Sequence, residues 1–171
     1  MSKVKKPSEH QELKDFISKK LLFQAIKEKN LEGVKKALKR MPDVNVKDGY
    51  GESPLHWAAC YGWVELINLL IDKGADINIK NSHEFTPLHW AVTERYGYIP
   101  CPSGDEIINL LIDRGANINA EDNYGGTPLH WAVRVGRREM IELLISKGAK
   151  IKGYDVQTTN ESAEIFWSFP S

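Results

Sequence analysis

Apolar residues recur along the chain at helical spacing, in short blocks that end at glycine. In one block, residues 53–61, a serine precedes a proline, and the small or apolar side chains that follow share one helical face: Leu55, Ala58 and Ala59. Serine caps a helix and proline is favoured in its first turn, while Gly62 ends this one. The next block, residues 64–71, is apolar around much of its circumference and ends at Gly74. The pattern predicts two short helices followed by a turn-rich connector.

The same pattern returns along the chain. The string Ser-Pro-Leu-His-Trp-Ala-Ala at 53–59 is followed by Thr-Pro-Leu-His-Trp-Ala-Val at 86–92 and again at 127–133. The prolines of the first two strings are 33 residues apart, and those of the second and third are 41 apart. The second block recurs too, with the endings Gly-Ala-Asp-Ile-Asn at 74–78 and Gly-Ala-Asn-Ile-Asn at 115–119. A lone helix pair cannot bury its apolar side, so such pairs must stack into one elongated core.

These motifs resemble the ankyrin repeat over about residues 19–152, through the 33-residue period, the Thr-Pro-Leu-His-x-Ala string and the Gly-Ala-Asp-x-Asn ending. The resemblance implies an all-α solenoid of stacked helix-turn-helix units with hairpin-like connectors. It also implies a protein-binding role, because the first helices of ankyrin-like units line a concave groove. Its four repeats are expected at 19–47, 48–80, 81–121 and 122–152.

The two ends of the chain depart from the repeat. We expect one domain at 8–152, after a disordered basic segment at 1–7. Residues 8–18 predict an added helix, because one of its faces is apolar at Leu13, Phe16 and Ile17. The last segment, 153–171, is expected to be a capping half-repeat, or else a docking tail, because its end is apolar at Ile165, Phe166, Trp167 and Phe169.

Charge and cysteine content change the picture only slightly. The 23 basic side chains balance the 23 acidic ones, so no net charge draws the chain onto nucleic acid or an anionic membrane. Residues 1–47 hold 13 basic and 6 acidic side chains. This excess of positive charge fits a terminal repeat that faces water, and nucleic-acid binding is the alternative explanation. Cys60 and Cys101 form no CxxC pair, which favours reduced thiols. With neither a signal peptide nor an apolar run of ~20 residues, we expect a soluble intracellular protein, cytoplasmic or delivered by a bacterium into a host cell.

Tryptophan occupies one register of the repeat, at Trp57, Trp90 and Trp131. At about 100° per residue, the Trp57 indole points roughly 150° away from the helical face of the first block, so we expect it outside that core. The resemblance then places the three indoles along the groove, where tryptophan is enriched in binding hot spots. The alternative is that each indole packs laterally against the first helix of the neighbouring repeat and is structural.

The resemblance also implies that hairpin tips and the ends of the first helices contact a partner. The candidate partner-binding residues are therefore Tyr50, Glu52, Trp57, Tyr61, His83, Phe85, Trp90, Glu94, Tyr96, Tyr98, Tyr124, Trp131 and Arg134. The third repeat carries an eight-residue insertion whose segment 96–104 is too rich in proline and glycine for a helix. Such loops often carry function, although a tolerated insertion without a role is the alternative. Glu84 replaces the usual hairpin glycine in this repeat and leaves its turn geometry open.

Histidine recurs in register at His56, His89 and His130. These side chains stand a repeat apart, about 10 Å by helix spacing, which is too far for shared Zn–N bonds of about 2.1 Å. The resemblance implies instead that they hydrogen-bond the turn backbone. We expect no catalytic residue, metal, cofactor or small-molecule substrate.

The function expected is therefore that of a monomeric protein–protein interaction module: a scaffold, adaptor or inhibitor that binds through the groove, the hairpin tips and the insertion. An enzyme or thiol-regulated switch built around Cys101 in the insertion is the alternative, together with nucleic-acid binding by the basic first repeat. The resemblance adds one modification, because the asparagine that ends an ankyrin-like unit can be hydroxylated by an oxygenase. Asn78 is the candidate for it.

Overall fold

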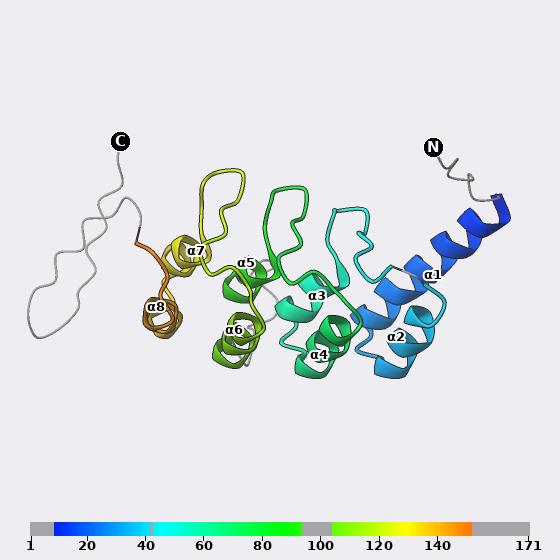
Figure 1. Cartoon of the computed structure of the whole chain (residues 1–171), viewed down its shortest axis with the longest axis horizontal. Coiled ribbons are helices and arrows are strands. Elements are labelled where there is room, and N and C mark those ends of the chain that lie inside the picture. Colours follow the sequence, from blue (N-terminus) through cyan, green and yellow to red (C-terminus); the bar gives the residue numbers. More distant parts are fainter. Residues whose placement is uncertain (1–8, 42, 94–103, 152–171) are drawn as a thin grey trace, which may run out of the picture.

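The computed structural model describes residues 9–41, 43–93 and 104–151. Within these ranges it contains helices and no strands, and the helices follow one another in pairs: α1 (Glu9–Lys27) and α2 (Leu31–Leu38), α3 (Pro54–Cys60) and α4 (Val64–Asp72), α5 (Pro87–Val92) and α6 (Gly104–Asp113), α7 (Pro128–Val135) and α8 (Arg138–Ser146). The pairs stand side by side in one row (Figure 1), which confirms the predicted all-α solenoid. The predicted terminal segments 1–7 and 153–171, and residues 94–103 of the insertion, lie outside the described residues.

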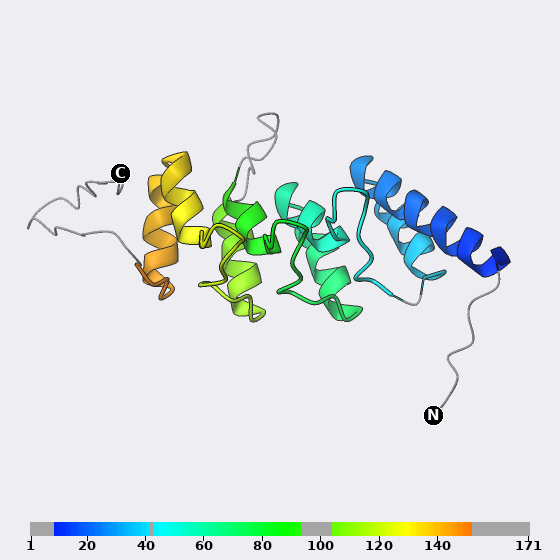
Figure 2. The same ribbon diagram turned by 90° about the horizontal axis from the view of Figure 1, so that it is seen from above.

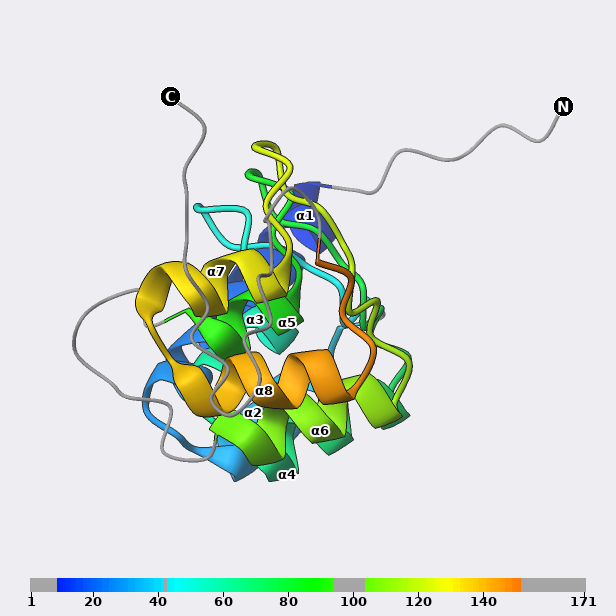
Figure 3. The same ribbon diagram turned by 90° about the vertical axis from the view of Figure 1, so that its left-hand side faces the viewer.

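The row has three layers when it is viewed along its length. Figure 3 shows α3, α5 and α7 in one layer and α2, α4, α6 and α8 in a second, while the hairpin connectors project beyond the first layer. The view from above shows the same pairs arranged along one long axis (Figure 2). All three connectors therefore present their tips on one side of the molecule.

The sequence signals that open and close each helix act as expected. The Ser53 hydroxyl accepts the His56 N–H at 3.4 Å, and the Thr127 hydroxyl accepts the His130 N–H at 3.3 Å. Helix α7 ends at Gly136 in the left-handed conformation, with φ of 75°. Side-chain caps before a proline thus start the first helices, and Gly62 and Gly136 end α3 and α7.

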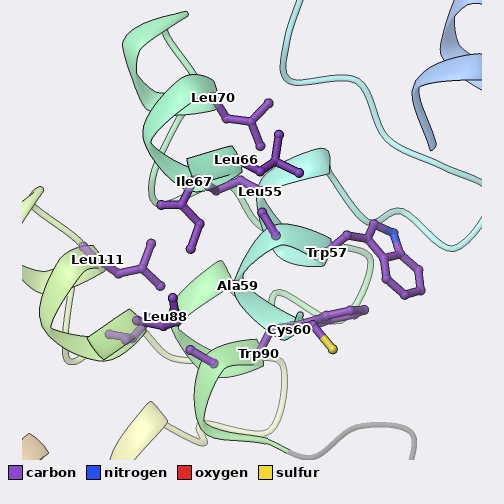
Figure 4. Packing of buried hydrophobic residues seen from close by; sticks show 14 of the residues in the cluster. Leu55, Trp57, Ala59, Cys60, Leu66, Ile67, Leu70, Leu88, Trp90 and Leu111 are labelled. Carbon is purple, nitrogen blue, oxygen red and sulfur yellow. The ribbon is translucent and has the colours of Figure 1, made fainter. Parts of the chain in front are cut away.

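The core runs continuously through the row. Leu55 of α3 and Leu66, Ile67 and Leu70 of α4 are 0–1% exposed, and α5 and α6 repeat the arrangement with Leu88, Ile107, Ile108 and Leu111. Figure 4 shows Ile67, Leu88 and Leu111 pointing toward one another between two successive pairs. Ala58 and Ala59 are fully buried, and their small side chains let the second helix and the next repeat approach closely.

The first helix differs from its prediction. The sequence predicted a separate helix at 8–18, but α1 is one helix of 19 residues, because its sequence contains no glycine or proline that would interrupt it. Its first half extends beyond the stack, so Leu13, Phe16 and Ile17 are 56%, 63% and 48% exposed. Among the described residues, no helix is both long enough and apolar enough to span a bilayer.

Candidate functional site

Three tight hairpins form the edge of the molecule from which its tips project. In the first, the Asp48 N–H donates to the Glu52 carbonyl at 2.9 Å, and the Gly51 N–H donates to the Asp48 carbonyl at 3.1 Å. The Asp48 carboxylate closes the turn from inside by accepting the N–H groups of Tyr50 and Glu52 at 2.8 and 3.0 Å. The same set of bonds recurs around Asn81 and around Asp122.

Hydrogen bonds also connect each hairpin to the next. The Lys47 ammonium donates to the Lys80 carbonyl at 2.7 Å, and the Lys80 ammonium donates to the Glu121 carbonyl at 3.2 Å. Nearer the tips, the Asn123 N–H donates to the His83 carbonyl at 3.2 Å. The three hairpins are therefore held in register with one another as well as within themselves.

The asparagines at the repeat endings form a second set of connections. The Asn78 side-chain oxygen accepts the Asn117 N–H at 2.7 Å, and its amide donates to the Gly115 carbonyl at 3.3 Å. Asn45 makes the equivalent bonds one repeat earlier. The half-buried Asn78 thus fixes the third repeat to the second, and its predicted hydroxylation stays a prediction.

Two of the three recurring histidines, His56 and His89, join a first helix to the hairpin of the next repeat, as the resemblance implied. His56 Nδ1 accepts the Ser53 N–H at 3.1 Å, so Nε2 carries the proton and donates to the Phe85 carbonyl at 2.9 Å. His89 repeats this with the Gly126 carbonyl at 3.1 Å. Burial lowers the pKa of His56 to about 4 and lowers that of His89 as well, so both rings stay neutral near neutral pH. In the described part of the chain, no three His, Cys, Asp or Glu side chains gather closely enough to hold a metal ion.

Trp57 and Trp90 correct the prediction that the indoles lie outside the core, and they show the lateral packing between neighbouring first helices that was its alternative. Trp57 is 8% exposed and Trp90 is 1% exposed, and both belong to the hydrophobic core. Their ring centroids are 5.2 Å apart with an interplanar angle of 73° (Figure 4). The wheel argument failed because a first helix in a solenoid is covered on two sides, by its own second helix and by the first helix of the next repeat.

A pairing that the sequence analysis missed holds the indoles in place. Trp57 Nε1 donates to the Asp48 carboxylate at 2.9 Å, and Trp131 Nε1 donates to the Asp122 carboxylate at 2.8 Å. The signal was present as an aspartate nine residues before a tryptophan in two of three repeats. In the third repeat the equivalent residue is Asn81, and its amide instead donates to the Glu52 carboxylate of the preceding repeat, at 2.8 and 3.0 Å.

Burial divides the predicted partner-binding residues into three groups. Four of them have almost no surface to offer, so their prediction as partner contacts is corrected: Glu52 and Trp90 at 1%, Phe85 at 7% and Trp57 at 8%. Each is buried because it packs or hydrogen-bonds between repeats. Six others reach the surface at the hairpin tips or helix ends: Tyr50, Tyr61, His83, Tyr124, Trp131 and Arg134. Glu94, Tyr96 and Tyr98, and the cysteine of the alternative switch, Cys101, lie outside the described residues.

A cavity of about 430 Å³ opens between the third and fourth repeats. We call it the Trp131 cavity; the described residues that line it are His83, Phe85, Thr93, Tyr124, Trp131, Arg134 and Val135. It contains five of the predicted partner-binding residues. It arises where α5 stops at Val92 and Thr93 turns away in extended backbone, while α7 continues to Val135. The last turn of α7 therefore has no turn of α5 beside it.

Sequence comparison agrees with this architecture. Residues 22–101 and 98–155 match a family model described as ankyrin repeats in three copies. The two matched segments contain the three hairpins, all three Trp positions and the Trp131 cavity. No curated protein matches the chain at a significant level.

Proposed function

Because this chain belongs to the ankyrin-repeat family, whose repeats are in general protein–protein interaction modules, we propose that it binds a partner protein along its hairpin tips and concave groove. It would act there as a scaffold, an adaptor or an inhibitor. The observation that carries the proposal is the exposure of large aromatic side chains on a rigid edge. Tyr50 and Tyr124 are 71% and 80% exposed, on hairpins that are closed by backbone hydrogen bonds and by bonds to the Asp48 and Asp122 carboxylates.

Rigidity and amphipathic aromatics together favour binding. Tyrosine offers a large apolar ring with a polar hydroxyl, which is the kind of side chain that concentrates binding energy in interfaces. Since the hairpins are already fixed by bonds such as Asn123 N–H to the His83 carbonyl, a partner orders little additional backbone when it binds. Two tyrosines exposed on fixed turns thus supply contact area at a low entropic cost.

Basic side chains lie over aromatic rings of the first helices, and their positive charge favours binding of an acidic partner. The Lys27 ammonium is 6.0 Å from the Trp57 ring centroid, and the Lys29 ammonium is 5.9 Å from that of Tyr61. Arg134 lies 5.2 Å above the Trp131 ring. Rims of this kind combine stacking with charge, and favour partners that present carboxylates.

The test compares tip variants with matched variants on the opposite layer. Tyr50→Ala and Tyr124→Ala, singly and together, remove exposed side chains that pack against little, while Glu65→Ala on α4 and Glu106→Ala on α6 serve as controls. Partners are isolated with the wild-type chain, identified by mass spectrometry and titrated in purified form against every variant. We expect the double tip variant to weaken binding at least tenfold, with unchanged circular dichroism, and the controls to bind normally. Equal affinity of wild type and double variant for every partner would refute the proposal.

A further inference from the structure

The Trp131 cavity has a shape and a charge that specify its occupant. We propose that it receives a large apolar side chain of an extended partner segment, with an Asp or Glu directly beside that side chain. This inference rests on the proposed protein-binding function and deepens it, since it names the chemistry of one contact.

The floor is apolar and fixed in place. The Phe85 and Trp131 ring centroids are 5.2 Å apart, with an interplanar angle of 50°. Trp131 is held at its far edge by the hydrogen bond from Nε1 to the Asp122 carboxylate, and Phe85 is 7% exposed. Rotation of Trp131 into the space would break this hydrogen bond to a charged group, so the indole stays in place. An apolar side chain that enters finds two aromatic faces already in position.

The size of the cavity suits a side chain of a peptide. Its volume of about 430 Å³ lies near the lower end of the ~300–1,000 Å³ range of ligand pockets. One wall is Val135, which is 39% exposed and gains from being covered. The Thr93 hydroxyl already donates to the His89 carbonyl at 3.0 Å, so it is not free to orient a small polar ligand.

Arg134 supplies a positive charge at the edge of the cavity. Arg134 stacks on the Trp131 ring, and no described carboxylate forms an ion pair with it. The nearest buried acid, Asp122, is occupied by the N–H groups of Tyr124 and Gly126 and by the indole. A guanidinium stacked on a ring keeps its fork of donors available for a carboxylate. An acidic residue beside the buried apolar side chain would meet it there.

The experiment selects peptides and then tests each half of the chemistry. The full chain is used to select from a displayed library of random 12-residue peptides, and a synthetic copy of the selected peptide is the probe for fluorescence anisotropy. We expect the selected sequences to share an aromatic or aliphatic residue next to Asp or Glu. Changing the apolar residue to Ala, or the acid to its amide, should each weaken binding at least tenfold.

Protein variants then locate the contact. Arg134→Gln should lose the preference for the acidic peptide over its amide copy, while Arg138→Gln on α8, which pairs with Glu142 away from the cavity, should keep it. Val135→Trp should fill the cavity and abolish binding in a chain that melts as the wild type does. If Val135→Trp does not fold, the acid preference of Arg134→Gln, a change at an exposed side chain, is the deciding measurement.

Several results would overturn the inference. The inference fails if the selected peptides share a motif that lacks the apolar residue next to Asp or Glu. It also fails if Arg134→Gln still prefers the acidic peptide over its amide copy. Competition of the probe by a 12-residue oligouridine, steeply weakened by salt, would assign the site to nucleic acid instead. If Arg134→Gln and Val135→Trp bind the natural partner normally while the double tip variant does not, the cavity proposal fails and the proposed function stands. If no variant affects partner binding, both fail.

Discussion

The junction between the second and third repeats and the junction between the third and fourth carry a tryptophan at the same register with opposite outcomes. At the first, Trp90 is 1% exposed and packs edge-on against Trp57 and His56, with centroids 5.2 and 5.7 Å away. At the second, Trp131 is half-buried and faces a cavity of about 430 Å³ with Arg134 above its ring. The repeat unit sets where the tryptophan stands, and its neighbours decide whether it becomes core or surface.

Two local changes produce the difference. Helix α5 ends at Val92, where the insertion begins, so the last turn of α7 has no turn of α5 beside it, and the described residues leave a cavity beside Trp131. In addition, the hairpin of the third repeat has Asn81 where the other two hairpins have aspartate, and the amide pairs with the buried Glu52. The sealed junction is therefore held by packing together with one buried amide–carboxylate contact.

Removing the indole from each junction tests the comparison most severely. Trp90→Ala deletes a fully buried ring and should lower the free energy of unfolding by about 4 kcal/mol. Trp131→Ala removes a half-buried ring at the edge of a cavity and should cost about half of that. Chemical denaturation of both variants measures the contrast. Equal losses would mean that the two junctions are packed alike.

The Asn81–Glu52 contact gives the next largest effect. Asn81→Asp restores the aspartate of the other hairpins, but it places a carboxylate against the buried Glu52 and removes both amide bonds. The free energy of unfolding should fall by about 3 kcal/mol. Adding Glu52→Gln should recover most of this loss, because the new amide donates to the new carboxylate. A double-mutant cycle measured by urea denaturation checks this recovery. If Glu52→Gln does not restore stability to Asn81→Asp, the loss does not come from repulsion between the two carboxylates.

Lowering the pH should weaken the sealed junction. The pKa of His56 in the folded chain is about 4, below the usual value near 6.5, because burial disfavours the charged ring. Between these values the unfolded chain binds a proton that the folded chain does not, so stability is complete above about pH 6.5 and falls as the pH drops toward 4. From pH 7 to pH 5, His56 alone should remove about 2 kcal/mol.

Urea denaturation across this pH range measures the effect. His56→Gln should reduce the pH dependence of the free energy of unfolding, because glutamine does not titrate in this range. The remaining pH dependence belongs to groups such as His89, whose pKa is also lowered by burial. Direct titration of the imidazole by NMR provides a second readout. A midpoint for His56 near its usual value would remove this explanation.

Much of the fold follows from local signals in the sequence. The Ser-Pro and Thr-Pro strings start α3, α5 and α7, and glycines such as Gly136 end helices in the left-handed conformation that other residues avoid. Periodic apolar blocks then require stacking, since no single helix pair buries them. The continuous α1 was missed because the sequence was divided at the expected start of the first repeat, although nothing between Glu9 and Lys27 breaks a helix.

The candidate site was less predictable because it depends on contacts between repeats. A helical wheel for Trp57 describes one helix and its own partner, whereas the burial of the indole comes from the next repeat, 33 residues away at Trp90. The cavity depends on a length difference between α5 and α7, which follows from where the inserted loop departs. The hydrophobic pattern of a single helix predicts neither the burial of an indole by the next repeat nor the length difference between two neighbouring helices.

The smallest predicted change in the free energy of unfolding comes from substitution of Glu84 in the hairpin of the third repeat. Glu84 has φ of 60°, in the left-handed region where the equivalent residues Gly51 and Gly125 have φ of 81° and 74°. A non-glycine residue in that region costs about 1 kcal/mol, and the exposed ion pair of Glu84 with Lys80 offsets little of it. Glu84→Gly should therefore raise the free energy of unfolding by about 0.5–1 kcal/mol. Gly125→Ala, where a new methyl group meets no atom within 4 Å, should lower it by a similar amount. Thermal melts of the two variants measure both signs, and a stability loss in Glu84→Gly would show that the Lys80 pair outweighs the backbone conformation.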